Sequence, residues 1–251
     1  LVTADEQGHS PVFRVALEGT EQPERLTADG AYSSVVVDPA GTHAFATRSS
    51  YAYPAEVVRI DLRDGVAPAE RVRALRGPAE RPALPGRLED VSTTVTDTDG
   101  STHTVRSYLA LPEGASAENP APLLLWIHGG PLGSWNAWSW RWNPWIMVAR
   151  GYAVLLPDPA LSTGYGQEFV QRGWGAWGAA PYTDLMAATD AVEQRPEIDE
   201  TRTAAMGGSF GGYMANWVAG HTDRFDAVVT HASLWALDQF GPTTDAAYYW
   251  A

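Results

Sequence analysis

The stretch Met206-Gly207-Gly208-Ser209-Phe210-Gly211-Gly212 decides which fold is expected for this chain. It lies between a predicted strand at Thr203–Met206 and a predicted helix that begins at Ser209. In that setting the pattern Gly-x-Ser-x-Gly predicts a sharp strand-to-helix turn with the serine exposed at its tip. Glycines beside the turn have no Cβ atom to clash with the strained backbone. Ser209 is therefore the candidate nucleophile, and the glycines of the turn are Gly207, Gly208 and Gly211.

The alternative interpretation of this stretch is a glycine-rich turn in which Ser209 only caps a helix. The surrounding segments favour the first interpretation, because strands and helices alternate along the chain. Continuous apolar runs, typical of strands covered on both faces, occur at Pro122–Ile127 and Tyr152–Leu156. Helices are predicted at about 137–150 and 183–194, and one further strand at 226–230.

A hairpin is expected before these units, because residues 88–97 and 105–111 alternate in polarity around Asp99-Gly100. Strands that alternate with helices indicate a doubly wound, mostly parallel sheet. We therefore predict the α/β class over residues 88–251, with an α/β-hydrolase fold truncated at its C-terminal side.

Residues 1–85 have a different pattern, with short β-branched strands between turn clusters. Four such strands are predicted, at 11–17, 33–38, 43–47 and 56–61. Four strands at this spacing would make one propeller blade or part of a sandwich, and a single blade cannot bury both of its faces. Residues 66–87 are rich in Pro, Ala and Arg and are predicted to be a linker.

The composition excludes several classes of function. The chain has 251 residues and a formal charge of -13 at pH 7. This acidic balance argues against nucleic acid or an anionic membrane as a partner, because a phosphate-binding surface needs an excess of basic residues. No apolar run approaches the ~18 residues of a membrane span. Cysteine is absent, which excludes thiolate catalysis and fits a cytoplasmic protein. Histidines and carboxylates lack ligand spacing, so we expect no metal and no other cofactor.

A second motif, His128-Gly129-Gly130-Pro131, directly follows the predicted strand at 122–127. A serine hydrolase needs two N–H donors for the oxyanion of its tetrahedral intermediate. One comes from the residue after the nucleophile, here Phe210, and the other from a His-Gly-Gly loop. Gly130 is the first candidate for the second donor and Gly129 the next. Because the base of this fold follows the nucleophile in the chain, we expect His128 to be structural.

These two motifs, together with Ser162-Thr-Gly-Tyr-Gly166 and Asp184-Leu-Met-Ala187, resemble those of the prolyl oligopeptidase family of serine peptidases. The acylaminoacyl-peptidase and dipeptidyl-peptidase-like branch is the most similar. The resemblance implies a β-propeller before the catalytic domain, so residues 1–85 would be the propeller's C-terminal strands. Residues 88–251 would be the N-terminal part of the catalytic domain. Asp158-Pro-Ala-Leu161 departs from the family, whose members usually have an Arg-Gly-containing stretch there.

The resemblance also implies an activity, namely hydrolysis of short peptides or acyl-amino acids through an acyl-enzyme on Ser209. It implies no cofactor, and a propeller that excludes large folded substrates. A carboxylesterase on the same fold is an alternative, because the turn and the oxyanion loop serve esters equally. A catalytically incomplete binding remnant is another alternative.

The acid and the base of a triad are expected after the nucleophile. The candidate acids in that stretch are Asp223, Asp226, Asp238 and Asp245, and the candidate bases are His221 and His231. His231, at the end of the last predicted strand, is the only serious contender. We therefore expect a fragment that begins inside a propeller, ends before the triad acid and histidine, and is inactive alone. Its partners would be a short peptide substrate and the remainder of the same protein, and a homo-oligomer is left open.

Aromatic residues crowd the segment after the His-Gly-Gly loop, at Trp135, Trp138, Trp140, Trp142 and Trp145. Their mixed spacing cannot place all of them on one helix face, so core and interdomain packing is the favoured interpretation. Residues 233–240 follow the last predicted strand, where similar enzymes have an apolar substrate pocket. Leu234, Trp235 and Phe240 are the candidate pocket residues.

Overall fold

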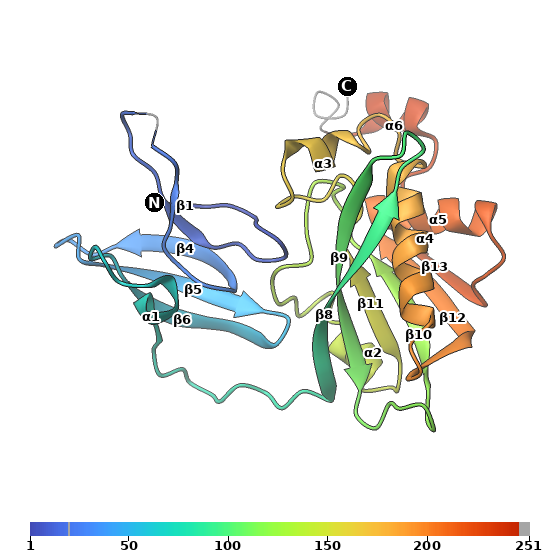
Figure 1. Cartoon of the computed structure of the whole chain (residues 1–251), viewed down its shortest axis with the longest axis horizontal. Helices are drawn as coiled ribbons and strands as arrows, with labels where there is room; N and C mark the ends of the chain where they lie inside the picture. The colour runs from blue at the N-terminus through green and yellow to red at the C-terminus, as the bar shows by residue number, and fades with distance from the viewer. Residues whose placement is uncertain (20, 246–251) are drawn as a thin grey trace.

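The computed structural model describes residues 1–19 and 21–245 (Figure 1). An all-β region at the N-terminus and an α/β region lie beside each other and are joined by an extended segment. We call these parts the β region (residues 1–74) and the α/β region (residues 86–245). None of the helices in the described part of the chain is long and apolar enough to span a membrane.

The α/β region is built on one six-stranded sheet of order β13-β12-β10-β11-β9-β8. The four strands β13, β12, β10 and β11 are parallel, whereas β9 runs antiparallel to both β11 and β8. This arrangement confirms the predicted α/β class and the mostly parallel sheet. The strand bounds are β8 (Gly86–Thr96), β9 (Thr102–Pro112), β10 (Ala121–Ile127), β11 (Ala153–Pro157), β12 (Ile198–Gly208) and β13 (Ala227–His231).

Both faces of this sheet are covered, which explains why the central strands are apolar without alternation. Along β10, Leu123 and Leu125 pack in a core with the two long helices, whereas Leu124 and Trp126 pack in a second core with α2 on the other face. The helices are α2 (Trp145–Val148), α3 (Gln167–Gln171), α4 (Ala180–Glu193), α5 (Phe210–His221) and α6 (Leu237–Thr243).

The helix predicted at about 137–150 is wrong, because only α2 forms there, over Trp145–Val148. Side chains take up the backbone N–H groups that a helix would use. Ser139 Oγ accepts from the N–H of Trp142 at 3.0 Å, and Asn143 Oδ1 accepts from the N–H of Trp145 at 3.1 Å. Such local bonds compete with helical ones. The tryptophans of this segment range from buried (Trp135 and Trp145) to 70% exposed (Trp140).

The β region contains a four-stranded antiparallel sheet, β4-β5-β6-β7, and a small three-stranded sheet, β1-β2-β3. Val12, Leu26 and Ile60 are fully buried in its core. The bounds are β1 (Val2–Thr3), β2 (Val12–Arg14), β3 (Glu24–Arg25), β4 (Ala31–Val37), β5 (His43–Ser50), β6 (Tyr53–Asp61), α1 (Pro68–Arg71) and β7 (Val72–Ala74).

The predicted order of this region needs two corrections. The strand predicted at 11–17 is the short β2 and lies outside the four-stranded sheet. The fourth strand of that sheet is β7, which falls inside the predicted linker and pairs with β6 through Val72 and Ile60. A three-residue strand after a helical turn carries too little periodicity to be recognised from the sequence. The assignment of residues 1–85 to a propeller stays a prediction.

A buried ion pair ties α3 to α4. Arg172 donates to both carboxylate oxygens of Asp184, at 2.9 and 3.0 Å, and to both of Asp97, at 2.9 and 2.7 Å. Asp184 is fully buried and also accepts from the N–H of Ala160 at 2.7 Å. Burial raises the pKa of Asp184, and the hydrogen bonds from Arg172 oppose that rise. The hydrogen bonds from Arg172 lower the pKa of Asp97. Arg172 thus stabilises the charged form of a solvent-excluded carboxylate.

We expect Arg172→Ala to lower the free energy of unfolding by about 3–5 kcal/mol, because it leaves the Asp184 carboxylate buried without its counterion. Without Arg172, only the hydrogen bond from the N–H of Ala160 still opposes the effect of burial. The pKa of Asp184 is therefore higher in the folded variant, and protonation stabilises that variant as the pH falls. The loss should therefore be smaller at pH 5 than at pH 8, as measured by denaturant unfolding. Arg202→Ala, at a 58% exposed side chain, is the control, and an equal loss in both variants would contradict the prediction.

Candidate active site

Ser209 adopts the conformation expected of an exposed nucleophile at a strained turn. Its φ is 58° and its ψ is -121°, a combination that non-glycine residues rarely adopt. Ser209 is exposed between β12 and α5, and it occupies the N-cap position of α5 without a side-chain capping bond. The simple capping interpretation therefore does not describe it.

The glycines around Ser209 are required by close contacts between backbones. A Cβ on Gly207 would lie 2.2 Å from the carbonyl oxygen of Gly211, and a Cβ on Gly211 would lie 2.2 Å from that of Ile127. Three elements, β12, α5 and β10, thus meet with no room for a side chain. Gly208 faces Trp142 instead, because its added Cβ would lie 3.0 Å from the indole ring.

The oxyanion loop, which we define as residues 129–136, lies directly beside the nucleophile. A Cβ on Gly129 would lie 3.1 Å from the carbonyl oxygen of Gly208 and 3.4 Å from the Cβ of Ser209. Gly130 follows with a φ of 133°, a conformation that favours glycine. Phe210 begins α5, and its fully buried ring packs edge-on against Trp177 at 5.1 Å. The fold thus brings the predicted donor segments together, while the choice between Gly129 and Gly130 stays a prediction.

His128 holds the oxyanion loop and does not bond to Ser209. Its Nδ1 lies 2.7 Å from the carbonyl oxygen of Gly129, which can only accept, so Nδ1 carries a proton. Its Nε2 lies 2.9 Å from the hydroxyl oxygen of Ser162. The side chain is only 7% exposed. These contacts are those of a structural residue, in agreement with its place before the nucleophile.

Asp158 is a site residue whose role the sequence did not reveal. Its fully buried carboxylate accepts from the hydroxyl of Ser134 at 2.7 Å, the N–H of Trp135 at 2.9 Å and the hydroxyl of Tyr165 at 2.6 Å. Burial and the Asp158 charge raise the pKa of Tyr165, which keeps its proton for this bond. The signal in the sequence was an aspartate directly after the apolar strand β11. Asp158 anchors the oxyanion loop through its bonds to Ser134 and Trp135.

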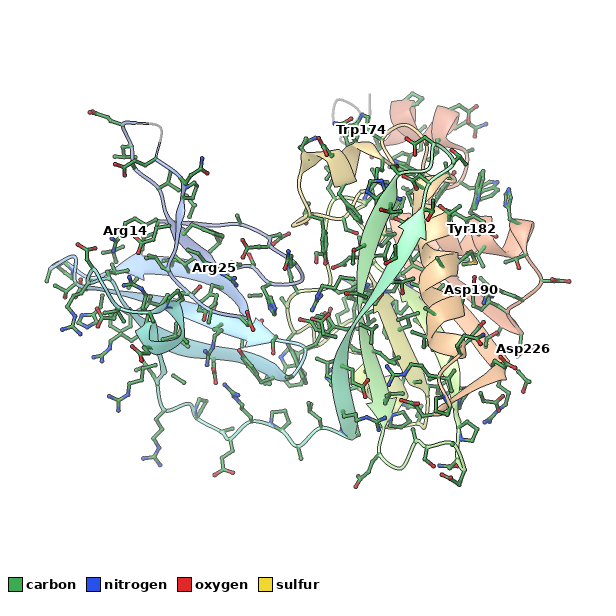
Figure 2. The ribbon with its side chains drawn as sticks, viewed as in Figure 1. Arg14, Arg25, Trp174, Tyr182, Asp190 and Asp226 are labelled. Atoms are coloured by element: carbon green, nitrogen blue, oxygen red, sulfur yellow. The ribbon has the colours of Figure 1, made fainter. Side chains whose placement is uncertain are left out.

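The described residues do not complete a catalytic triad. Within residues 1–19 and 21–245, no side chain is hydrogen-bonded to the Ser209 hydroxyl. The His231 ring packs edge-on against Trp142 at 5.2 Å, and its carbonyl oxygen accepts from the N–H of Ser209 at 3.0 Å. Asp226 precedes β13 and accepts from the N–H of Thr203 at 3.1 Å. In Figure 2 it lies far from Trp174, a residue that follows α3.

None of the remaining candidate groups among the described residues is hydrogen-bonded to the Ser209 hydroxyl. The ring of His221 stacks on Trp217 at 4.1 Å, and its Nδ1 lies 2.8 Å from the Trp217 carbonyl oxygen. Asp223, Asp238 and Asp245 are exposed. Ser209 itself lines a hollow of about 400 Å³ together with His231, Arg141 and Trp142, and Tyr51 of the β region also lines it.

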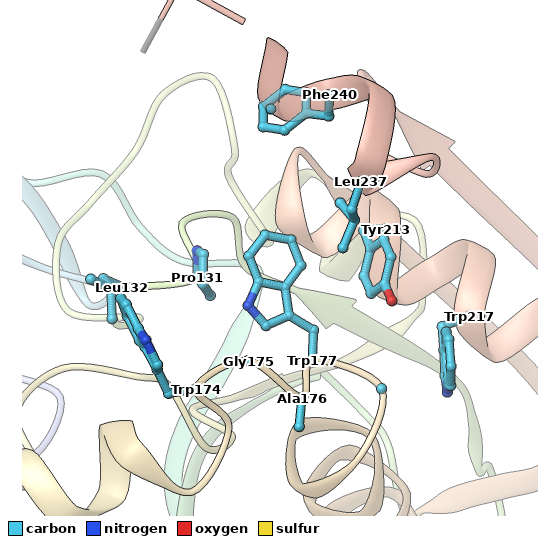
Figure 3. A pocket seen from close by; sticks show the side chains of 12 residues that line it. Pro131, Leu132, Trp174, Gly175, Ala176, Trp177, Tyr213, Trp217, Leu237 and Phe240 are labelled. Atoms are coloured by element: carbon cyan, nitrogen blue, oxygen red, sulfur yellow. The ribbon is translucent and has the colours of Figure 1, made fainter. Parts of the chain in front are cut away.

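An apolar pocket of about 510 Å³ begins beside the oxyanion loop (Figure 3). Among the described residues, no charged side chain lines it, and the ring of Trp177 stands at its centre. Tyr213, on the first turn of α5, joins this pocket to the nucleophile, because its N–H donates to the carbonyl oxygen of Ser209 at 3.0 Å. The side chains that line the pocket are those of Pro131, Leu132, Trp174, Trp177, Tyr213, Trp217, Leu237 and Phe240.

The three predicted pocket residues do not lie together. Phe240 lines the pocket, whereas Leu234 packs against the larger apolar core of the α/β region. Trp235 is 56% exposed and packs on Tyr213, with 5.7 Å between the ring centres. The sequence prediction missed Trp174 and Trp177, although their stretch Gly173-Trp-Gly-Ala-Trp-Gly178 has a visible Gly-Trp pattern.

Sequence comparisons find similarity to known peptidases. The profile of the prolyl oligopeptidase family matches residues 138–251. A probable dipeptidyl-peptidase 5 of Emericella nidulans is 32% identical over 245 residues, which are 94% of this chain and 33% of that protein. An uncharacterized peptidase of Bacillus subtilis is 31% identical over 99% of this chain and 36% of its own length. The chain thus spans about a third of these curated relatives.

Solved structures show the same fold. The Mycobacterium tuberculosis puromycin-hydrolyzing peptidase is 26% identical with a TM-score of 0.74, over 97% of this chain and 37% of that one. The Pyrococcus horikoshii acylaminoacyl peptidase has a TM-score of 0.78 at 19% identity, over 98% and 38%. At that identity the second likeness shows the fold alone.

Two glycines of α5 provide a matched test of the turn. In the complete gene product, Gly211→Ala should lower the melting temperature and slow fluorophosphonate labelling of Ser209 about tenfold, because the new Cβ must displace the backbone of Ile127. Gly220→Ala meets no atom within 4 Å, and it should leave labelling unchanged and raise stability by about 0.5–1 kcal/mol. Equal labelling rates in the two variants would show that the close contact is unimportant.

Proposed function

The chain belongs to the prolyl oligopeptidase family, and we propose that it supplies the nucleophile of a serine peptidase that hydrolyses short peptides or acyl-amino acids through an acyl-enzyme. The observation that carries the proposal is the strained and exposed Ser209, with φ of 58°, beside the glycines of the oxyanion loop. A backbone held at such an angle without a capping bond is a feature of active sites rather than of ordinary helix starts.

The proposed reaction begins when the Ser209 hydroxyl oxygen attacks the carbonyl carbon and its proton passes to a general base. The resulting oxyanion would accept from the N–H of Phe210 and from that of Gly130 or Gly129. Each such donor contributes on the order of 3 kcal/mol to transition-state stabilisation. Collapse of the intermediate expels the amine, which takes the proton, and water then hydrolyses the acyl-enzyme.

The base and its acid are proposed to come from residues beyond those described. No described side chain bonds to the Ser209 hydroxyl, and the ring of His231 is engaged with Trp142. A short substrate is proposed because Tyr51 of the β region lines the hollow that contains Ser209. An apolar residue on the acyl side is proposed because the described residues that line the adjoining pocket are uncharged and largely aromatic.

Labelling of the complete gene product tests the nucleophile. A fluorophosphonate should label the wild-type protein and not Ser209→Ala, whereas Ser101→Ala, in the exposed β8–β9 turn, should be labelled like the wild type. Residues 1–251 alone should react only at the background rate, because no described base activates Ser209. Label on another residue, or none on the wild type, would overturn the proposal.

A comparison of peptide anilides with short acyl esters separates the peptidase from the esterase alternative. The peptidase should hydrolyse both, and hydrolysis of esters alone would replace the proposal with an esterase.

The pocket is tested by substituting two aromatic residues, Phe240 in its lining and Trp235 outside the lining. Phe240→Ala should lower kcat/KM by about tenfold for anilides with a large apolar residue at the cleaved bond, because the side chain loses its wall. The effect on an alanine anilide should be smaller. Trp235→Ala should leave the preference unchanged, since Trp235 lies outside the lining. A shift with Trp235→Ala alone would move the binding site away from this pocket.

A further inference from the structure

The first residues of the β region dock on the loops that surround the active site. The N–H of Gln7 donates to the carbonyl oxygen of Gly164 at 3.0 Å, and the hydroxyl of Tyr108 donates to that of Gly8 at 3.3 Å. A Cβ on Gly164 would lie 3.0 Å from the backbone nitrogen of Glu6. The backbones thus approach each other closely, so this contact is a fitted interface between the two regions.

Asp5 stands at the centre of this contact, with both carboxylate oxygens bound to the α/β region. Its Oδ1 accepts from the side-chain amide of Asn136 at 2.9 Å, and its Oδ2 accepts from the hydroxyl of Thr163 at 2.5 Å. Hydrogen bonds to an ionised acceptor are about twice as strong as those between neutral groups. Asp5 therefore links two loops that are separate in the chain, one containing Asn136 and the other containing Thr163.

Both of these bonds lead to the oxyanion loop. Asn136 is the last residue of that loop, and the N–H of Thr163 donates to the carbonyl oxygen of Gly133 at 2.9 Å. The neighbouring Ser162 bonds to His128, which in turn bonds to Gly129. A loop with glycines at 129, 130 and 133 has little conformational stiffness of its own. Its shape must therefore be set by such outside contacts.

We propose that Asp5 is a positioning residue, through which the docked β region holds the oxyanion loop in its productive geometry. This inference rests on the proposed function. Hydrogen bonds to the oxyanion form only as the tetrahedral intermediate forms, so a displaced donor lowers kcat and leaves substrate binding unchanged. Full removal of a donor costs about 10²–10³ in kcat, and a loosened loop should cost less.

The test uses the complete gene product and two pairs of variants. Asp5→Ala and Thr163→Val should each lower kcat for a peptide anilide about tenfold, with KM within twofold of the wild type. Asp5→Asn should stay within threefold of the wild type, because its amide can accept from Asn136 and donate to the Thr163 hydroxyl. Thr163→Ser keeps the hydroxyl and should restore the rate.

An inhibitor that forms an oxyanion gives the readout that a general loss of stability would not. The serine oxygen adds reversibly to the carbonyl carbon of a peptidyl trifluoromethyl ketone, and the ketone oxygen becomes an oxyanion. The affinity of this inhibitor should therefore fall about tenfold in Asp5→Ala and Thr163→Val. Asp29→Ala is the control, because Asp29 is exposed and its ion pairs with described residues are to His9 and Arg25, both in the β region. If Asp5→Ala does not fold, the Thr163 pair answers the question alone.

The possible outcomes are distinct. The inference is overturned if KM rises at constant kcat, if Thr163→Ser is no better than Thr163→Val, or if Asp29→Ala loses as much activity as Asp5→Ala. Absence of fluorophosphonate label on wild-type Ser209 would instead remove the proposed function. A labelled wild type with unaffected Asp5 and Thr163 variants would remove only this inference.

Discussion

The close approach of three backbones beside Ser209 is the constraint on which the site depends. β12, α5 and β10 meet at Gly207, Gly211 and Ile127 with no space for a Cβ atom. This contact forces the turn at Ser209 into its strained conformation and keeps the hydroxyl exposed. Because β10 neighbours β12 in the sheet, the loop after β10 must lie beside the nucleophile. Sheet order and turn strain thus produce the site together.

Buried carboxylates stabilise the loops at this edge of the sheet. Asp158 collects three hydrogen bonds from the oxyanion loop and Tyr165, and Asp184 is paired with Arg172 and bonded to the N–H of Ala160. Loops have unpaired backbone groups, and an ionised acceptor can satisfy several of them at once. The cost of burying each carboxylate is offset only where its partners are complete. These aspartates therefore specify loop geometry, while the apolar cores specify the layers.

The sequence predicted the α/β region well and the β region less well, for a physical reason. Continuous apolar strands, the hairpin and the glycine-rich turn are local patterns, and they appear in the structure close to the predicted places. The helix expected at 137–150 failed because Ser139 and Asn143 bind backbone N–H groups that a helix needs. The three-residue strand β7 was missed because it forms through pairing with β6 rather than through its own periodicity. A short stretch of sequence does not show which side chains will compete for backbone N–H groups or which strand will pair with which.

The same distinction holds at the site. The sequence by itself determined the candidate nucleophile, the glycines around it and the oxyanion segment, because their chemistry needs particular residue types at fixed spacing. Only the tertiary structure decided that Phe240 lines the pocket while Trp235 does not, and that Asp158 anchors the oxyanion loop. It alone brought Asp5 to Asn136 and Thr163, across 131 and 158 positions of the chain. Such contacts depend on how whole layers pack, and no local pattern encodes them.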